Sequence, residues 1–270
     1  MQKQLWLLEV PEKRQTAEAW VWFKDGWQLF VRRAGEWLLY MLASILLLMV
    51  GVLVFRGLSG GLSQVALLSW LAQLLSLLGV SWVLLSVQAG LYRSMARVAR
   101  GEKVVMADAY WLLLQFKHRQ VWRLVALVCG FNVCLQWAQA LWVGEIVMLS
   151  EGVRVDAVQL QRLMILSALY WVVFTTLTWA VLPMLVEFDE RSLWGHVQRN
   201  WQGTWRNWAG LSLLFVLILG AVIVGAVLAA VLGLVLPWLQ VLLLLLLLLV
   251  VQPLMGAWVF SAYRHIFTRW

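Results

Sequence analysis

Six apolar segments, each about 20 residues long, constrain this chain more than any other feature of its sequence. They cover residues 38–55, 66–91, 121–143, 160–186, 209–235 and 237–262. A helix needs roughly 20 residues to cross a hydrocarbon core of about 30 Å, where only helices and closed barrels satisfy their backbone hydrogen bonds. The sequence therefore predicts an all-α fold, a polytopic membrane helical bundle with six transmembrane helices.

The composition agrees with a membrane protein. Hydrophobic residues make up 63% of the chain and charged residues 13%, whereas soluble domains have about 45–50% and about 25%. The 20 tryptophans favour water–lipid interfaces. Residues 1–37 are too rich in charge for a signal peptide, so the first segment is expected to be retained. We expect a single integral membrane domain over residues 1–270.

The basic residues predict the orientation of the chain. Eighteen of the 21 lysines and arginines fall on one side of the predicted spans, and only Arg56, Arg154 and Arg162 fall on the other. Because positive residues stay in the cytoplasm, both termini are predicted to be cytoplasmic in a bacterial inner membrane. The topology also explains the net charge of +8, which needs no nucleic-acid partner.

The stretch from His196 to Leu214 interleaves tryptophan with arginine, and this admits two interpretations. Single-stranded nucleic acid is held by such residues on one shared face, whereas a helix at a membrane surface separates its aromatic and basic residues. On a helical projection Trp201, Trp205 and Trp208 lie together, and Arg199 and Arg206 lie opposite them. We therefore predict an interfacial helix that leads into the fifth span.

A similar stretch precedes the first span. The predicted interfacial aromatic and basic residues of both stretches are Trp27, Arg32, Arg33, Trp201, Trp205, Arg206 and Trp208. In the first stretch the residues expected to share an apolar face are Trp20, Phe23, Trp27, Phe30, Val31 and Ala34. Trp22 does not fit this face.

The two stretches also suggest an internal repeat. The pairs that match at an offset of 174 are Trp27 with Trp201, Gln28 with Gln202, and Arg32 with Arg206. A fainter middle copy places Phe116 and Arg119 at 86 residues beyond Phe30 and Arg33. We therefore predict a three-fold repeat, in which each unit has an amphipathic interfacial pre-helix and two transmembrane helices. The units would cover about residues 17–100, 105–190 and 193–270 and would run parallel.

Uncharged polar residues inside the segments are the candidate lining of the bundle. Asn132, Gln136 and Gln139 form one stripe on the third span, and Gln88 and Gln252 are possible partners on other spans. Amides in lipid need partners, so the stripe should face the bundle. It either makes structural hydrogen bonds between helices or forms a polar lining for a lipid headgroup or small solute.

The sequence offers little for catalysis, metals or cofactors. His118, His196 and His265 lie on the predicted cytoplasmic side near the acidic residues Glu187, Asp189 and Glu190, but without metal-ligand spacing. Cys129 and Cys134 are five residues apart in an apolar segment and are expected to be packed thiols. We predict no catalytic residues, no metal site and no cofactor.

Three short stretches carry a resemblance to a known family. They are LLEVP at Leu7–Pro11, GWQLFVRR at Gly26–Arg33, and FSAYRHIF at Phe260–Phe267. With the six-segment plan of the whole chain, they resemble uncharacterised six-helix inner-membrane proteins of proteobacteria, the YciC-like group, and membrane domains attached to some glycerophosphodiesterases. The chain departs from that group at Ala34–Gly35, where proline is common, and at His265, where an acidic residue is common. The resemblance implies a bacterial cytoplasmic-membrane location and no catalytic residues.

Two hypotheses of function follow. The first is a non-enzymatic scaffold or assembly protein that supports other envelope proteins. The alternative is a lipid-handling protein or weakly selective transporter that uses a cavity between the helix pairs. Membrane lipids are the expected partners in both cases, and nucleic acid is not.

Overall fold

Long helices account for most of the chain, as its apolar segments predict. The computed structural model describes residues 6–63, 69–110, 119–142, 148–149, 152–153, 157–188, 192–235 and 237–269. The helices are α1 (Glu18–Val31), α2 (Ala34–Ser63), α3 (Ser69–Ala99), α4 (Arg119–Trp142), α5 (Ala157–Thr178), α6 (Val181–Glu187), α7 (Leu193–Arg206), α8 (Trp208–Val235) and α9 (Pro237–Phe267), with the short 3-10 helix η2 (Met106–Tyr110). Two-residue strands form two antiparallel pairs, β1 (Trp6–Leu7) with β4 (Thr268–Arg269) and β2 (Met148–Leu149) with β3 (Gly152–Val153).

Five stretches of the described residues are long and apolar enough to cross a membrane. They are Ala34–Phe55, Leu74–Ala99, Arg119–Gln139, Val158–Glu187 and Trp208–Leu232, and they correspond to the first five predicted spans. The sixth predicted span lies in α9, a helix of 31 residues, some of whose side chains lie outside the described part of the chain. The chain therefore has the helices of a multi-pass membrane protein, and its sixth span stays a prediction.

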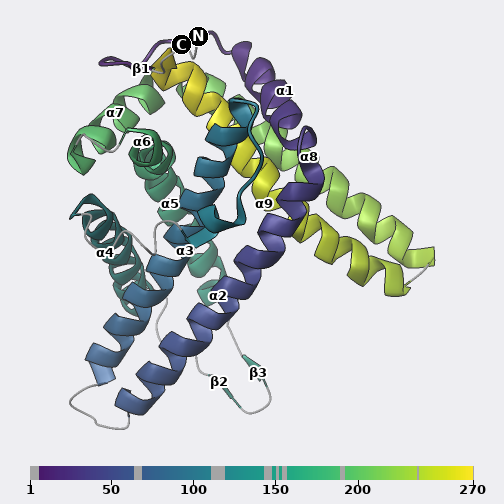
Figure 1. Cartoon of the computed structure of the whole chain (residues 1–270). Coiled ribbons are helices and arrows are strands. Elements are labelled where there is room, and N and C mark those ends of the chain that lie inside the picture. Colours follow the sequence, from purple (N-terminus) through teal and green to yellow (C-terminus); the bar gives the residue numbers. More distant parts are fainter. Residues whose placement is uncertain are drawn as a thin grey trace.

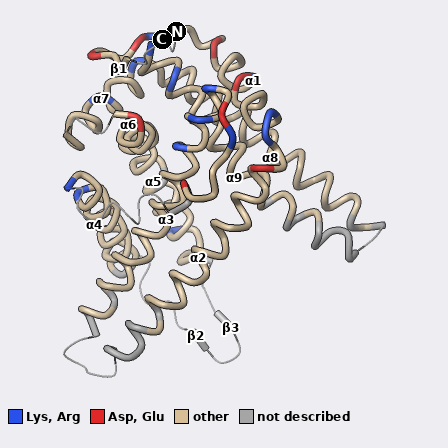
Figure 2. The backbone as a smooth tube through the Cα atoms, in the orientation of Figure 1, with Lys and Arg blue, Asp and Glu red and all other residues tan. Residues whose placement is uncertain are grey.

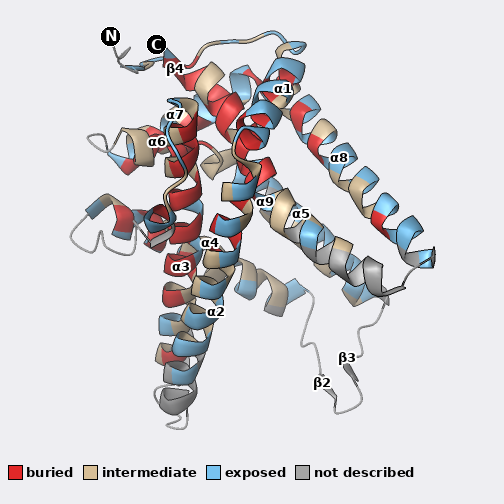
Figure 3. Cartoon of the chain, turned by 45° about the vertical axis from the view of Figure 1, so that its right-hand side comes forward, coloured by how far each residue is buried: buried red, intermediate tan, exposed pale blue. Residues whose placement is uncertain are grey.

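The helices diverge from a common head (Figure 1). The pair α2–α3 and the pair α8–α9 form hairpins that point away from each other, and α4 packs against α3 and α5. Both termini, α1 and α7 lie at the head, where most of the charged residues also gather (Figure 2). Figure 3 shows that buried residues are concentrated in the head, whereas the outer parts of the hairpins are largely exposed. The apolar outer surfaces are those expected of helices surrounded by lipid.

Large aromatic side chains hold the head together. Trp22 of α1, Trp37 and Tyr40 of α2, and Trp258 and Tyr263 of α9 are all fully buried in one apolar cluster. Aromatic residues bury about 150–250 Å² each and dominate the energetics of such cores. The cluster therefore fixes the N-terminal helix against the C-terminal helix.

The helix α1 carries aromatic residues on two sides, and the side that packs against the protein is largely not the apolar face that was expected to lie at the membrane surface. Trp20 and Trp27, which were expected on the apolar face, are 53% and 50% exposed. Trp22, which did not fit that face, is fully buried. The buried residues of α1 are Ala19, Trp22, Gly26, Leu29 and Phe30, and of these only Phe30 belongs to the expected apolar face. Hydrophobicity alone does not distinguish the two sides, because both are apolar and only one packs against the protein.

The fourth predicted span, 160–186, is broken in the structure. The helix α5 ends at Thr178 and α6 begins at Val181. Pro183 explains the break, because its ring clashes with the carbonyl of Trp179 in a continuous helix and it has no N–H to donate. The side chain of Asn200 satisfies the backbone groups at the break, since its Nδ2 donates to Thr176 O at 2.7 Å and its Oδ1 accepts from Ala180 N at 3.0 Å.

Two predicted loops differ from the observed structure. Residues 56–64 were expected to form a turn, but α2 extends to Ser63, the last described residue before position 69. Glycine costs only about 1 kcal/mol relative to alanine in a helix, which does not prevent the helix from extending beyond the span. The loop predicted at residues 145–161 contains the small hairpin of β2 and β3, and α5 begins before the loop was expected to end.

The helices α1 and α7 are alike in ways that bear on the predicted repeat. Each has 14 residues, and each is followed by a break and a long apolar helix that begins at Ala34 or at Trp208, 174 residues apart. Their inward positions also correspond at this offset: Trp22 to His196 and Gly26 to Asn200. The lead-in of the middle copy falls largely on residues 111–118, outside the described residues. The three-fold repeat stays a prediction.

Asn207 connects the N-terminal segment to the junction between α7 and α8. Its Oδ1 accepts from the backbone N–H of Arg14 at 2.7 Å, and its Nδ2 donates to the carbonyl oxygens of Glu12 and Gly203, both at 2.9 Å. Arg206 adds a hydrogen bond from Nη1 to Pro11 O at 3.0 Å. At the other end of this segment β1 pairs with β4, so both termini are tied to the head.

Asp108 anchors the connection that follows α3. Its buried carboxylate contacts Arg93 Nε at 3.1 Å and Arg97 Nε at 3.2 Å, and it accepts a hydrogen bond from Ser94 Oγ at 3.1 Å. The backbone of Asp108 lies directly on α3, because a Cβ atom at Gly90 would collide with its carbonyl oxygen. The connection is therefore held by charge-assisted contacts and by a close backbone approach.

Candidate functional site

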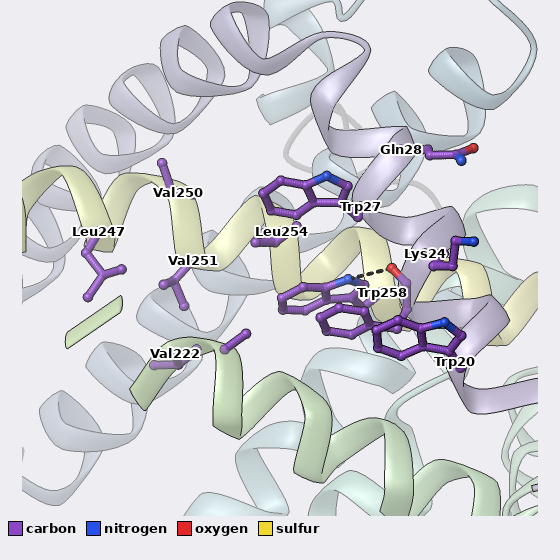
Figure 4. Close-up of a pocket in the computed structure, with 12 residues that line it drawn as sticks. Trp20, Lys24, Trp27, Gln28, Val222, Leu247, Val250, Val251, Leu254 and Trp258 are labelled. Carbon is purple, nitrogen blue, oxygen red and sulfur yellow. Dashed lines mark hydrogen bonds between the residues drawn. The ribbon is translucent and has the colours of Figure 1, made fainter. Parts of the chain in front are cut away.

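A pocket of about 470 Å³ opens between α1 and the α8–α9 hairpin (Figure 4). It is lined by Trp20, Phe23, Lys24, Trp27 and Gln28 of α1, by Ala221 and Val222 of α8, and by Leu247, Val250, Val251, Leu254 and Trp258 of α9. Ligand pockets in proteins commonly have volumes of about 300–1,000 Å³ and mainly apolar walls with a few polar groups. This pocket has both properties.

A glycine and an indole position α1 at the edge of the pocket. A Cβ atom at Gly26 would lie 2.5 Å from Trp258 Cδ1 and 2.8 Å from Trp258 Cα, so only glycine lets the two helices approach this closely. The indole Nε1 of Trp258 donates to the carbonyl oxygen of Phe23 at 2.9 Å. These contacts hold one side of α1 against α9 and leave its other aromatic side facing the pocket.

Three stacked rings form one wall of the pocket. Trp20 and Phe23 have ring centroids 5.5 Å apart and planes at 11°, and Phe23 and Trp258 have centroids 4.6 Å apart and planes at 15°. Figure 4 shows the stack extending from α1 to α9. The result is a flat apolar surface that is built from two helices far apart in the sequence.

The polar groups of the pocket lie at one end. Lys24 and Gln28 are one helical turn apart on the exposed side of α1, and Figure 4 shows them on the side away from Leu247 and Val251. The opposite end is lined by aliphatic side chains of α8 and α9. Among the residues that the structure describes, no carboxylate lies within ion-pair distance of Lys24. The pocket therefore has a cationic end and an aliphatic end.

The predicted polar lining is not gathered at this pocket. Gln88, Gln136 and Gln252 are exposed, and Gln139 is half-buried. Asn132 alone of the five has a described hydrogen bond to another helix, since its Oδ1 accepts from Tyr170 Oη at 3.3 Å while its Nδ2 donates to Val128 O. This bond joins α4 to α5, as expected of a structural amide in a membrane helix. A polar lining formed by the five residues stays a prediction.

The predicted interfacial tryptophans all have exposed surface. Trp27, Trp201, Trp205 and Trp208 lie on the outside of α1, α7 and the start of α8, and the rings of Trp201 and Trp205 meet edge to face at 5.4 Å. The predicted interfacial arginines lie in three different environments. Arg32 is exposed, Arg33 Nη1 contacts Glu36 Oε1 at 3.0 Å, and Arg206 donates to the N-terminal segment.

The sequence analysis of α7 missed its buried side. His196, Asn200, Gly203 and Asn207 lie inward, and two of them make the hydrogen bonds described above. Their spacing of four, three and four residues is that of one helical face and was a usable signal. Its residues are polar or small, so this face is less conspicuous in the sequence than the tryptophans on the other side of the helix.

A second pocket, of about 360 Å³, lies between α4 and α7. Its lining includes Arg123, Leu127, Leu193, Trp194 and Val197. It also combines a cation with an indole, but the described rings form no stack across it.

The histidines lie in separate environments. His196 is buried, with Nε2 at 3.2 Å from the carbonyl oxygen of Phe188, and His265 Nε2 lies 3.0 Å from Asp25 Oδ2. His118, Asp189 and Glu190 lie outside the described residues. Within the described part of the chain, no three histidine, cysteine or acidic residues come together as metal ligands would. Cys129 is buried, Cys134 is exposed, and neither forms a disulfide.

The family resemblance of the three short stretches remains a prediction. Leu7–Pro11 and Phe260–Phe267, which are far apart in the sequence, lie together in the structure, since Leu8 N donates to Phe267 O at 2.9 Å. Gly26–Arg33 contains the glycine on which α1 packs against α9. Comparison with protein-family models, with curated proteins and with solved structures finds no match to this chain.

Proposed function

We propose that this chain is a non-enzymatic, lipid-handling protein of the bacterial inner membrane that holds a lipid chain in the pocket between α1, α8 and α9. The observation that carries the proposal is the stacked wall of Trp20, Phe23 and Trp258, which continues into an aliphatic trough on a membrane-type hairpin. Of the two predicted functions, the pocket favours the lipid-handling one. The amide stripe predicted as a polar lining on the third span does not line this pocket.

The energetics define what such a site must provide. An acyl chain that leaves the bilayer gains no hydrophobic free energy, because lipid tails are as apolar as leucine. Selective binding must therefore come from close packing against a preformed surface and from polar contacts at the headgroup. The flat ring stack provides the first, and the Lys24–Gln28 end provides the second.

The proposal includes the finer arrangement predicted from the sequence. Six spans with both termini in the cytoplasm would place the charged head of Figure 2 at the cytoplasmic surface. The exposed tryptophans of α1 and α7 would then lie at the headgroup level. The shared lengths and inward positions of α1 and α7 support a duplicated lead-in helix for the first and third units.

Filling the pocket tests the proposal. Ala221 lines the pocket and is exposed, so Ala221→Trp places an indole in the trough without entering the core. Native mass spectrometry of the purified protein is expected to show retained phospholipid in the unmodified chain and loss of most of it in this variant. The matched control is Ala230→Trp, an exposed position nine residues along α8 and on its opposite side, which should retain the lipid. Equal retention in both variants would refute the proposal.

The scaffold function is a second candidate, and the divergence of the hairpins favours it. Leu219 and Val227 of α8 are exposed, on a hairpin whose outer part is largely exposed (Figure 3). A photo-crosslinking residue at either position is expected to capture one envelope protein in intact cells. Leu214, which is buried on the same helix, provides the control position. Recovery of only lipid or of the protein itself would argue against a scaffold.

A further inference from the structure

We infer that the pocket selects a phospholipid with a net negative headgroup, which Lys24 binds while one acyl chain lies along α8 and α9. The inference rests on the proposed function and specifies the class of lipid. The inference depends on three observations. They are the position of Lys24 at the rim, the order of polar and apolar groups along the pocket, and the contrast with the second pocket, which contains Arg123.

The first observation is the position of Lys24. The side chain lies at the pocket rim, and within the described residues no carboxylate neutralises its charge. A lysine at this place can lay its aliphatic stem on the apolar wall while its ammonium group remains in the headgroup layer. The neighbouring Asp25 does not pair with it, because its carboxylate lies 3.0 Å from His265 Nε2.

The second observation is the direction in which polarity changes. Lys24 and Gln28 provide an ammonium and an amide at one end, and Leu247, Val251 and Val222 provide only hydrocarbon at the other (Figure 4). A phospholipid has the same order of groups along its length. The amide of Gln28 can donate to a phosphate or glycerol oxygen beside the ammonium group. Gln28 carries no charge, so the preference for a negative lipid depends on Lys24.

The third observation separates this site from general attraction of anionic lipid to a basic protein. The net charge of +8 attracts negative lipid to the whole surface, and the pocket at Arg123 also combines a cation with an indole. Of these two pockets, formed by described residues, the α1 pocket is the one that joins its cation to a continuous ring stack and an aliphatic trough. Selection that belongs to the pocket must therefore depend on Lys24 and not on basic residues elsewhere.

The experiment measures which lipid remains bound. The full chain is placed in nanodiscs of equal amounts of phosphatidylglycerol and phosphatidylcholine, and native mass spectrometry counts the retained molecules after extraction. The unmodified protein should retain phosphatidylglycerol preferentially. Lys24→Gln should lower this preference roughly five-fold, the factor expected for one lysine near the membrane surface. Lys24→Arg should preserve the preference and shows that the site tolerates substitution.

Two further variants make the outcome decisive. Lys103→Gln removes an exposed lysine that does not line the pocket, and Arg123→Gln removes the cation of the second pocket. Both should leave the preference unchanged. The inference is overturned if Lys24→Gln retains the preference, or if Lys103→Gln or Arg123→Gln abolishes it equally. Failure of the unmodified protein to retain any lipid would instead overturn the proposed function itself, so the two failures are distinguishable.

Discussion

Replacing Asp108 with alanine is expected to lower the free energy of unfolding by about 3 kcal/mol, because it breaks a buried ion-pair network. Asp108 is 3% exposed and receives contacts from Arg93, Arg97 and Ser94. The side chains of Arg93 and Arg97 are 34% and 28% exposed, so water can partly replace the lost carboxylate. Because both arginines remain accessible to water, the expected decrease in the free energy of unfolding is at the lower end of the range for buried ion pairs.

The control is Glu102→Ala, which removes another carboxylate that pairs with Arg97, at 3.7 Å. Glu102 is an exposed residue, and Arg100 holds the pKa of its carboxyl below its ordinary value. Exposed ion pairs contribute little to stability, so this variant should unfold almost as the unmodified protein does. Denaturant or thermal unfolding in detergent provides the measurement. Similar destabilisation by both variants would show that burial of Asp108 has no special importance.

The sequence predicts the spans well because lipid imposes a simple physical requirement on them. About 20 apolar residues are needed for each crossing, and five of the predicted segments coincide with long apolar helices in the structure. The lead-in helices α1 and α7 were also expected, since amphipathic residues precede the first and fifth spans. These features depend only on the amino-acid composition of each segment and on the helical period of its apolar residues.

The contacts between helices were not predictable in the same way. Both sides of α1 are apolar, and only tertiary packing decides that Trp22 is buried while Trp20 and Trp27 face outward. The pocket depends on that choice, because its wall joins α1 to Trp258 across more than 230 residues of sequence. A single sequence contains no information on which of two apolar faces will find a partner.

Some local features of the structure have recognisable signals in the sequence. Pro183 within the fourth apolar segment indicates a break near Trp179, because proline removes a helical hydrogen bond. Asp108 follows the basic end of α3 closely in the sequence, and this order is compatible with an ion pair to Arg93 and Arg97. The polar face of α7 was likewise visible in its spacing.

Asn207→Leu is the second substitution with a large expected effect, about 2 kcal/mol in the free energy of unfolding. Leucine has the same branched shape as asparagine but forms no hydrogen bonds, so it leaves the N–H of Arg14 and the carbonyl oxygen of Glu12 without their partner. Both groups are partly buried, so water restores only part of the lost hydrogen bonding. The variant should also increase limited proteolysis of residues 8–16, because this segment then loses its contacts with Asn207 and keeps those of Leu8, Glu12 and Arg14 with the end of α9.

Gln202→Leu is the matched control, since Gln202 lies on the exposed side of the same helix, five residues before Asn207. It also replaces an amide side chain with leucine, but it removes no buried hydrogen bond. The unfolding and proteolysis of this variant should therefore resemble those of the unmodified protein. Rapid cleavage at residues 8–16 in both variants would mean that α7 does not hold the N-terminal segment. Cleavage confined to Asn207→Leu would show that one amide joins the start of the chain to the beginning of α8. Because α1 follows this segment directly, the same amide would also stabilise the aromatic wall of the pocket.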